Sequence, residues 1–265
     1  MYETEAAINL GSTAVLRVLL PKAVLDRDAR MRFFAYYAAD GFWAVGGASN
    51  NGSTAVDWAA RVLFRLENVL GRELGEHASS LIARSAEKVP PCSGGVYVLP
   101  FVAGERFPFR DPWLRFTVLG MSLDHDHRHV ARALFEGISF VVKAMNEALR
   151  ENGVEVAKAH CGGGGCQNPL MVRVLANVLC TPVVVYGGEV ARAATALGAA
   201  VTLMRALGHV PSITKAELRA VREGVVGVVE PDRDLCNAYS ECYSRFVRVC
   251  EALSSLMREL YGGGS

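Results

Sequence analysis

The sequence lacks three motifs by which phosphate-handling and hydrolytic enzymes are often recognised. It contains no Gly-x-x-x-x-Gly-Lys-Ser/Thr loop, no Gly-x-Ser-x-Gly elbow and no His-Glu-x-x-His zinc motif. The first absence excludes a P-loop NTPase as a simple interpretation. Any phosphate chemistry must therefore rest on other glycine turns.

The sequence also lacks a charge excess and a long apolar run. Twenty-eight Lys and Arg residues face 27 Asp and Glu, for a net charge of +1, which indicates neither nucleic acid nor an acidic surface as a partner. The apolar runs are too short to cross a bilayer, so no membrane association is expected. With 265 residues, 51% of them hydrophobic, the chain is predicted to be a soluble globular protein with an ample core.

No ordered cysteine framework is evident. The seven cysteines are an odd number, are scattered through mostly apolar patterns and follow no secretory signal. Reduced thiols and a cytoplasmic location are the simplest expectation.

A glycine-rich stretch in the second half of the chain organises the rest. A β pattern ends at His160-Cys161, four glycines occupy positions 162–165, and a helical pattern runs from Leu170 to Leu179. Asn168 is the expected N-cap and Pro169 fits the first helical position. A glycine loop before a helix N-terminus suits an anion such as phosphate, although a glycine turn between packed elements, without a ligand, would have the same sequence.

Two further glycine turns occur near the start of the chain. Strand-like segments 6–10 and 14–20 flank Gly11-Ser12-Thr13. A third strand at 42–47 leads through Gly46 to Ser53 into an amphipathic helix, which is expected to run through Asp57, Trp58, Val62 and Leu66. A small hydroxyl-bearing turn can donate hydrogen bonds to a phosphate, but most such turns bind nothing.

Two polar clusters each allow two interpretations. Asp124 to His129 carries three alternating histidines that could ligate a metal on a strand, but the apolar spacing that follows predicts the start of a long helix with Asp124 or Asp126 as its cap. In the loop 104–113, Glu105 and Arg106 either form an ion pair that fixes the loop or contact a substrate directly.

The remaining patterns predict alternating strands and helices. Strands are expected at 96–101, 182–186 and 225–229, and helices at 78–88, 191–207, 214–222 and 234–260. Several phosphate-suited turns without a P-loop suggest an actin-like ATPase (ribonuclease H-like) α/β fold, in which a mixed sheet is flanked by helices. Three strands are expected before the first helix.

Six blocks, in order, carry a family resemblance over about residues 7 to 208. They are Asn9–Thr13, Val45–Gly52, Leu99–Pro108, Gly120–His125 with Ala133–Gly137, Gly163–Pro169 with Leu175–Leu179, and Ala196–Ala200. In these blocks the chain resembles the carboxy-terminal domain of the FGGY carbohydrate kinases, the group that contains xylulokinase, gluconate kinase and glycerol kinase.

The resemblance implies ATP and Mg²⁺ as cofactors and a set of nucleotide contacts. It places Gly11, Ser12 and Thr13 at the β- and γ-phosphates and Gly52 near the phosphates. The residues implied to border the adenosine are Gly163, Gly164, Gly165 and Asn168. The implied reaction transfers the γ-phosphoryl group of ATP to a hydroxyl of a sugar, sugar acid or polyol, with gluconate or xylulose favoured by the Gly46–Gly52 and Gly104–Pro108 blocks. The resemblance assigns no metal ligand to this chain.

Departures from the family pattern qualify the resemblance. Asn177 stands where the family commonly has aspartate, Cys166 and Gln167 replace more usual residues, and the Gly104 loop carries two extra aromatic residues. Residues 1–261 are expected to form one nucleotide-binding domain and 262–265 a flexible tail. The amino-terminal sugar-binding domain is expected to be absent, and the aspartate general base to fall upstream of Met1, so no catalytic residue is expected here.

Three functions remain open on these residues. The chain is half of a sugar kinase that works with a separate amino-terminal half, an ATP-binding module without kinase activity, or a truncated or decayed fragment. ATP or ADP is the expected ligand, a sugar or polyol only together with an amino-terminal domain, and a homo-oligomer is left open. An exposed apolar face would favour the first and third over the second.

Overall fold

The centre of the molecule is a mixed seven-stranded sheet. The computed structural model describes residues 2–214 and 219–262, and its strand order is β3-β4-β2-β1-β7-β8-β9. Strands β1 and β7 and strands β7 and β8 are parallel, and the other neighbours are antiparallel. The strands are β1 (Tyr2–Leu10), β2 (Ala14–Leu20), β3 (Phe34–Ala39), β4 (Phe42–Ser49), β7 (Val154–Gly162), β8 (Val183–Tyr186) and β9 (Val225–Val229).

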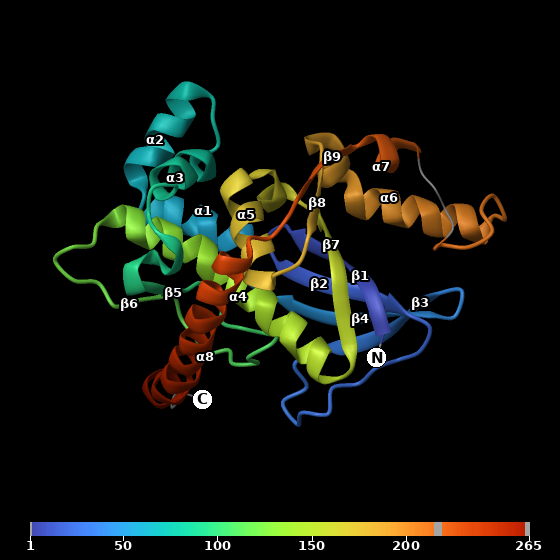
Figure 1. Ribbon diagram of the computed structural model, residues 1–265, viewed down its shortest axis with the longest axis horizontal. Coiled ribbons are helices and arrows are strands. Elements are labelled where there is room, and N and C mark those ends of the chain that lie inside the picture. Colours follow the sequence, from blue (N-terminus) through green and yellow to red (C-terminus); the bar gives the residue numbers. More distant parts are fainter. Residues whose placement is uncertain (1, 215–218, 263–265) are drawn as a thin grey trace.

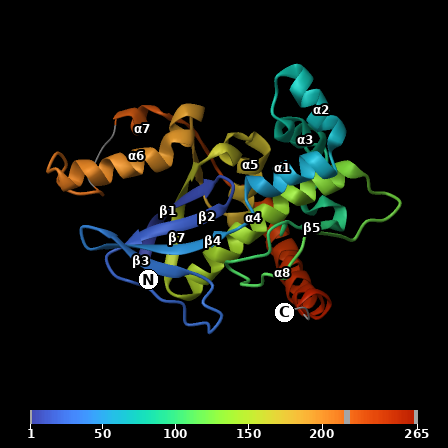
Figure 2. The ribbon, with the colours of Figure 1, turned by 180° about the vertical axis from the view of Figure 1, so that it is seen from behind.

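Helices lie on both sides of this sheet (Figures 1 and 2). The α-helices are α1 (Ser53–Val62), α2 (Arg65–Leu74), α3 (Ala78–Ala86), α4 (His127–Glu151), α5 (Pro169–Leu179), α6 (Gly188–Ala206), α7 (Arg219–Glu223) and α8 (Arg233–Tyr261). Short 3₁₀ turns η1 (Pro91–Gly95) and η2 (Gly164–Gln167) and a two-stranded ribbon of β5 (Tyr97–Leu99) and β6 (Thr117–Leu119) complete the chain.

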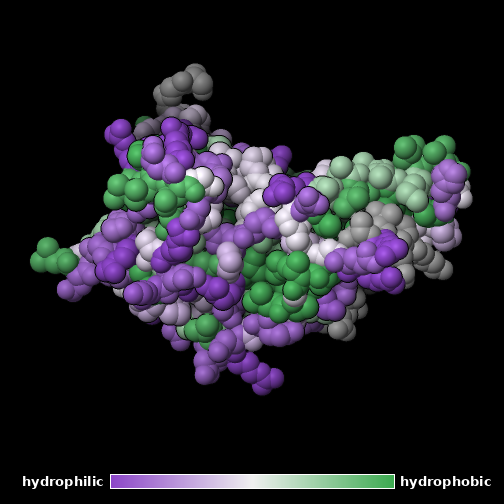
Figure 3. Space-filling model, turned by 90° about the horizontal axis from the view of Figure 1, so that it is seen from above, coloured by the Kyte–Doolittle hydropathy of each residue, from purple (hydrophilic) through white to green (hydrophobic). Residues whose placement is uncertain are grey.

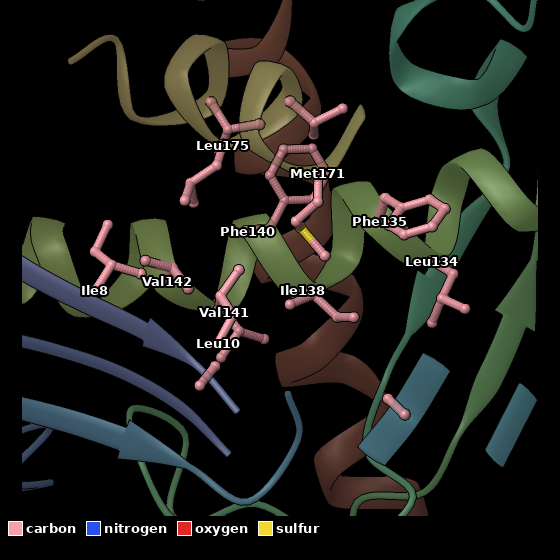
Figure 4. Packing of buried hydrophobic residues seen from close by; sticks show 14 of the residues in the cluster. Ile8, Leu10, Leu134, Phe135, Ile138, Phe140, Val141, Val142, Met171 and Leu175 are labelled. Carbon is pink, nitrogen blue, oxygen red and sulfur yellow. The ribbon is translucent and has the colours of Figure 1, made fainter. Parts of the chain in front are cut away.

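The strand alternation decides which face is buried. Ile8 and Leu10 of β1 point at Val141 and Val142 of α4 (Figure 4), and all four are at most 1% exposed. The opposite face of β7 carries Gly162, where an added Cβ would lie 3.4 Å from the Ala194 Cβ of α6. Helices α4 and α5 cover one face of the sheet, α8 packs on the outside of α5, and α6 begins over the other face.

The predicted fold class is confirmed, with one strand added. Four strands precede α1, because β3 pairs with β4 through the turn Asp40-Gly41, in which both residues have positive φ (52° and 81°). An Asp-Gly turn is a strong hairpin signal, since both central residues of the favoured turn need positive φ. The expectation of three strands before the first helix was therefore wrong.

The helix predicted through Leu66 is two helices. α1 ends at Val62 and α2 begins at Arg65, because Phe64 leaves helical geometry (φ −111°, ψ 51°) and is only 2% exposed. The chain turns to bury one aromatic ring. The other predicted helices and strands are confirmed to within a few residues at their ends, and residues 215–218 and 263–265 lie outside the described structure.

The cysteines differ from expectation. Six of the seven form disulfides: Cys92–Cys242, Cys161–Cys166 and Cys180–Cys236. The seventh, Cys250, is buried and free. The expectation of reduced thiols is therefore contradicted. Packing of α8 on η1 and α5 brings together two pairs that are far apart in the sequence, and the short η2 turn after β7 brings Cys161 and Cys166 together. The cytoplasmic location predicted from reduced thiols loses that support. Within the described residues, no helix is long and apolar enough to cross a membrane.

Candidate functional site

The glycine turns at Gly11 and at 162–165 meet at one cavity. It encloses about 450 Å³, which lies in the usual range for small-molecule sites. Gly11 and Ser12 line it from the β1–β2 turn, and Gly164, Gly165 and Asn168 line it from the loop between β7 and α5. Five of the eight predicted site residues therefore share one cavity.

The first turn is held from behind by the start of α1. The Gly52 and Ser53 amides donate to the carbonyls of Ser12 (3.0 Å) and Gly11 (2.8 Å). A Cβ on Gly52 would lie 2.5 Å from the Thr13 carbonyl carbon and oxygen, so only glycine allows this close approach. Gly52 and Thr13 do not line the cavity and instead support the turn that does.

The second glycine loop is shaped by contacts with the end of β1. Gly163 has φ +86°, and a Cβ there would lie 2.5 Å from the Asn9 Oδ1, so it packs behind the cavity rather than lining it. At Gly164 an added Cβ would meet no atom within 4 Å, so the backbone is open to the cavity. The Cys161–Cys166 disulfide closes the ring that contains all four glycines.

Asn168 joins two walls of the cavity. It caps α5 as predicted: its Oδ1 accepts from the amides of Leu170 (3.0 Å) and Met171 (3.2 Å). Its Nδ2 donates to the carbonyl of Ser79 on α3 at 3.1 Å. Since the first free amides of α5 are satisfied by Asn168 itself, this helix terminus has less to offer a phosphate than the sequence pattern implies.

Further residues, absent from the predicted site, complete the walls. Their positions are on α1, α3, α4, η2, α5 and α6, so no single motif contains them. They are Ser53, Val56, Asp57, His77, Ser79, Ser80, Phe135, Gln167, Met171 and Arg192. The sequence offered a signal only for Gln167 and Ser53, which adjoin glycine turns.

The cavity combines an apolar wall with three ionisable groups. Val56, Phe135 and Met171 come from α1, α4 and α5. Asp57 and His77 face one another, with 3.9 Å between Oδ1 and Nε2, and Arg192 projects from the first turns of α6. Such a site offers apolar or stacking contact to a ligand at the Val56, Phe135 and Met171 wall, and Arg192 offers a positive charge to an anionic group of the same ligand.

The Gly104 loop is fixed by Glu105 through hydrogen bonds to uncharged donors, where the sequence suggested an ion pair. Its carboxylate accepts from Ser49 Oγ (2.6 Å), Asn51 Nδ2 (2.9 Å) and the amides of Arg106 and Phe107 (2.9 and 3.0 Å). Burial raises the pKa of Glu105 to about 7, against the lowering effect of these four donors. The predicted Glu105–Arg106 ion pair is not among the described contacts; the Arg106 Nε donates to the Ala48 carbonyl at 3.0 Å.

The histidine-rich segment starts a helix. Asp126 caps α4 in a capping box: it accepts from the Arg128 amide (2.9 Å), and the His129 Nδ1 lies 3.1 Å from the Asp126 amide. This confirms the helix-start interpretation.

The sequence and the fold of this chain are similar to those of known proteins. Residues 6–207 match the model of the FGGY family of carbohydrate kinases, C-terminal domain. The gluconokinase of Bacillus subtilis (strain 168) is 27% identical over 210 residues, which cover 78% of this chain and 40% of that protein. The xylulose kinase of the same organism is 24% identical over 255 residues, covering 94% of this chain and 48% of that protein. The chain spans about half the length of the relatives that it matches.

Solved structures share the fold. Gluconate kinase from Lactobacillus acidophilus superposes with a TM-score of 0.80 at 21% identity, over 98% of this chain and 49% of that one. Plasmodium falciparum glycerol kinase with ADP gives 0.67 at 20% identity, over 92% and 46%. The fold is thus that of the sugar kinases, and the family match covers most of the sequence. The chain belongs to the FGGY family of carbohydrate kinases and corresponds to the C-terminal domain of that family.

Proposed function

We propose that this chain is the ATP-binding half of a sugar kinase, which transfers the γ-phosphoryl group of ATP to a hydroxyl of a sugar, sugar acid or polyol. The observation that carries the proposal is the cavity in which Ser12 of the first turn and Gly164 of the second glycine loop meet. One ligand can contact both turns, as a nucleotide with phosphates at one end and adenosine at the other would.

The residues present fit such a nucleotide. Gly11 and Ser12 would serve the β- and γ-phosphates, with Thr13 and Gly52 behind them. Gly164, Gly165 and Asn168 would border the adenosine, with Gly163 packed behind them, and the apolar wall would face its base. Arg192 supplies a positive charge at the same cavity. A relative of this fold carries ADP in its solved structure, which supports the same ligand class here.

The chemistry that this chain supplies is positioning. Ser12 can donate its hydroxyl to a terminal phosphate oxygen, and the α1 amides that hold the turn keep that hydroxyl in place. Mg²⁺ would neutralise phosphate charge when bound with the nucleotide. We assign no residue of this chain to the metal and none to the general base.

The sugar site would be completed outside these residues, by further chain of the same protein or by a separate subunit. Exposed apolar side chains favour a partner over an isolated ATP-binding module. Leu203 of α6 and Leu207, which caps the end of that helix, are 59% and 63% exposed, and Val226 of β9 is 67% exposed. Figure 3 shows apolar surface over α6, at the right of the view. A decayed fragment would expose the same apolar side chains, so nucleotide binding has to distinguish a functional kinase half from such a fragment.

Calorimetry with Mg-ADP tests the proposal. Gly164→Leu would place a bulky side chain into the open space at the cavity, and we expect loss of measurable binding. Gly198→Leu is the matched control, since an added Cβ at Gly198 on α6 also meets no atom within 4 Å. Equal binding by wild type, Gly164→Leu and Gly198→Leu would move the nucleotide to another site, and no binding by any of them would refute the proposal.

A further inference from the structure

A buried carboxylate fixes the segment that joins β4 to α1. Glu105 is 3% exposed, and its Oε2 accepts from two side chains of that segment, Ser49 Oγ at 2.6 Å and Asn51 Nδ2 at 2.9 Å. Both donor residues are fully buried. The other oxygen, Oε1, accepts from the two amides that follow Glu105 in the chain. Because both oxygens are occupied and the residue is buried, this carboxylate acts on the protein around it and not directly on a ligand.

The two donors are also linked to one another and to the rest of the Gly104 loop. The Ser49 Oγ accepts from the Asn51 amide at 3.0 Å. The Asn51 Nδ2 donates to the Gly104 carbonyl at 2.7 Å, and its Oδ1 accepts from the Ala103 amide at 3.2 Å. The whole hydrogen-bonding capacity of the Asn51 amide group is therefore directed at residues 103–105, which fixes residues 49–51 relative to that loop.

The same segment holds the Gly11–Thr13 turn. Ser49 pairs with Ala14 in the β2–β4 ladder, one residue beyond the turn. Gly52, which directly follows Asn51, donates its amide to the Ser12 carbonyl at 3.0 Å. Hydrogen bonds and one peptide link therefore connect the Glu105 carboxylate to Ser12, which lines the cavity.

The two ends of the cavity depend on different supports. The Gly11–Thr13 turn consists of small residues, of which Ser12 is exposed, so its position depends on the segment behind it. The glycine loop at 162–165 packs on the end of β1 and is followed by Asn168, which ties α5 to α3. A group that donates to a ligand works only while its supporting contacts hold it in place. Loss of the Glu105 contacts should therefore loosen the first turn and leave the second loop as it is.

We propose that Glu105 is a positioning residue for the nucleotide phosphates: through Ser49 and Asn51 it holds the Gly11–Thr13 turn where that turn can donate to a phosphate. This inference rests on the proposed kinase function. It gives the Gly104 loop a part in nucleotide binding, although none of the residues of that loop lines the cavity among those that the structure describes.

The test compares the affinities of Mg-ADP and adenosine, each measured by NMR titration of the full 265-residue chain. Adenosine lacks the phosphates, so its affinity reports on the 162–165 end of the cavity. Glu105→Gln should lower the Mg-ADP affinity at least about fivefold, within the range for coupling through a contact network, and leave the adenosine affinity unchanged. Ser49→Ala removes one donor and keeps the carboxylate, so it should change the ratio of the two affinities in the same direction.

A double-mutant cycle with Ser12→Ala separates positioning from a general loss of stability. If Glu105 acts through the turn, Glu105→Gln should cost less Mg-ADP affinity in Ser12→Ala than in wild type, since the hydroxyl that it positions is already absent. A general loss of stability would lower the affinity for both ligands and would add to the effect of Ser12→Ala.

Asp111→Asn is the matched control. Asp111 is a buried carboxylate of the same loop, and it accepts from the Trp113 amide at 2.8 Å. Its other partners, Ser254 and Arg258, lie on α8. Because Asp111 ties the loop to α8 and not to the segment behind the first turn, Asp111→Asn should keep the wild-type ratio of Mg-ADP to adenosine affinity even where it lowers the melting temperature.

Two results would overturn the inference: a wild-type affinity ratio in both Glu105→Gln and Ser49→Ala, or the same change of ratio in Asp111→Asn. Should Glu105→Gln fail to fold, the ratio in Ser49→Ala decides alone. Absence of Mg-ADP binding by the wild-type chain would refute the kinase proposal, and this inference with it.

Discussion

At the scale of single residues, Ser12 separates a phosphate-binding turn from an ordinary one. The residue is exposed and lines the cavity, while its carbonyl is held by the Gly52 amide. Ser12→Ala removes a hydrogen-bond donor to a charged phosphate. One hydrogen bond to a charged group is worth roughly 1.5–3 kcal/mol, so the Mg-ATP affinity should fall about 10- to 150-fold. Calorimetry measures the affinity, and the melting temperature should stay near that of wild type.

Ser244→Ala on α8 removes an equally exposed hydroxyl away from the cavity and should leave Mg-ATP binding unchanged. Unaltered affinity in Ser12→Ala would mean that the hydroxyl is idle. Unfolding of that variant would mean that it is structural.

Glu105 gives a prediction about pH. Its pKa is about 7 in the fold and 4.5 in the unfolded reference, so between these values the unfolded chain releases a proton that the folded protein retains. Stability therefore falls as pH rises from about 4.5 to 7, by on the order of 3 kcal/mol from this group. Chemical unfolding across this range should show a steeper decline for wild type than for Glu105→Gln.

Glu105→Gln places an amide donor among the Ser49 and Asn51 donors, so its absolute stability will be lower at all pH values. The informative quantity is the slope. Parallel pH profiles for the two proteins would show that Glu105 does not titrate in this interval.

At the scale of elements, periodicity and caps were enough to predict most helices and strands. Asn168 was predicted as a cap and Asp126 as one of two candidate caps, with Asp124, because N-capping is a local interaction. The Asp40-Gly41 hairpin was missed, although an Asp-Gly pair is itself a signal for such a turn. The break between α1 and α2 was missed because it depends on the burial of Phe64, which is a tertiary effect.

The candidate site was predictable only where a turn contributes its own residues. Gly11, Ser12 and Gly164 belong to local glycine patterns. His77 and Ser79 of the α3 start reach the cavity because Asn168 ties α3 to α5, and no sequence spacing encodes that contact. Two of the cysteine pairs were missed for the same reason, since Cys92 and Cys242 are 150 residues apart and Cys180 and Cys236 are 56 apart. Cys161 and Cys166 are only 5 residues apart, and their pairing depends on the local η2 turn.

The Asn168 link is testable by two substitutions. Asn168→Ala loses the cap, worth about 1 kcal/mol, and the hydrogen bond to Ser79, worth about 1 kcal/mol. Asn168→Asp keeps the capping oxygen and loses only the donor to Ser79. At roughly 2–4 °C per kcal/mol for a chain of this size, the melting temperature should fall about twice as far in Asn168→Ala as in Asn168→Asp. Equal losses would mean that the cap contributes nothing.

At the scale of the whole molecule, the question is whether these 265 residues can transfer a phosphoryl group by themselves. Transfer needs a general base within hydrogen-bond reach of the acceptor hydroxyl. Among the described residues that line the cavity, Asp57 of α1 is the one carboxylate. It faces His77, which caps α3. We expect that Asp57 is not the base and that a carboxylate elsewhere than on the walls of this cavity takes the proton.

We therefore expect the purified 265-residue chain to bind Mg-ADP and yet to leave gluconate, xylulose and glycerol unphosphorylated in a coupled ADP-release assay. Loss of a general base alone costs about 10²- to 10⁴-fold in rate, and an incomplete sugar site adds the loss of positioning. Turnover at a rate ordinary for kinases, about 1–100 s⁻¹, would contradict this expectation. Asp57→Asn would then show whether Asp57 is the base, because loss of a base lowers kcat while the Mg-ADP affinity stays that of wild type.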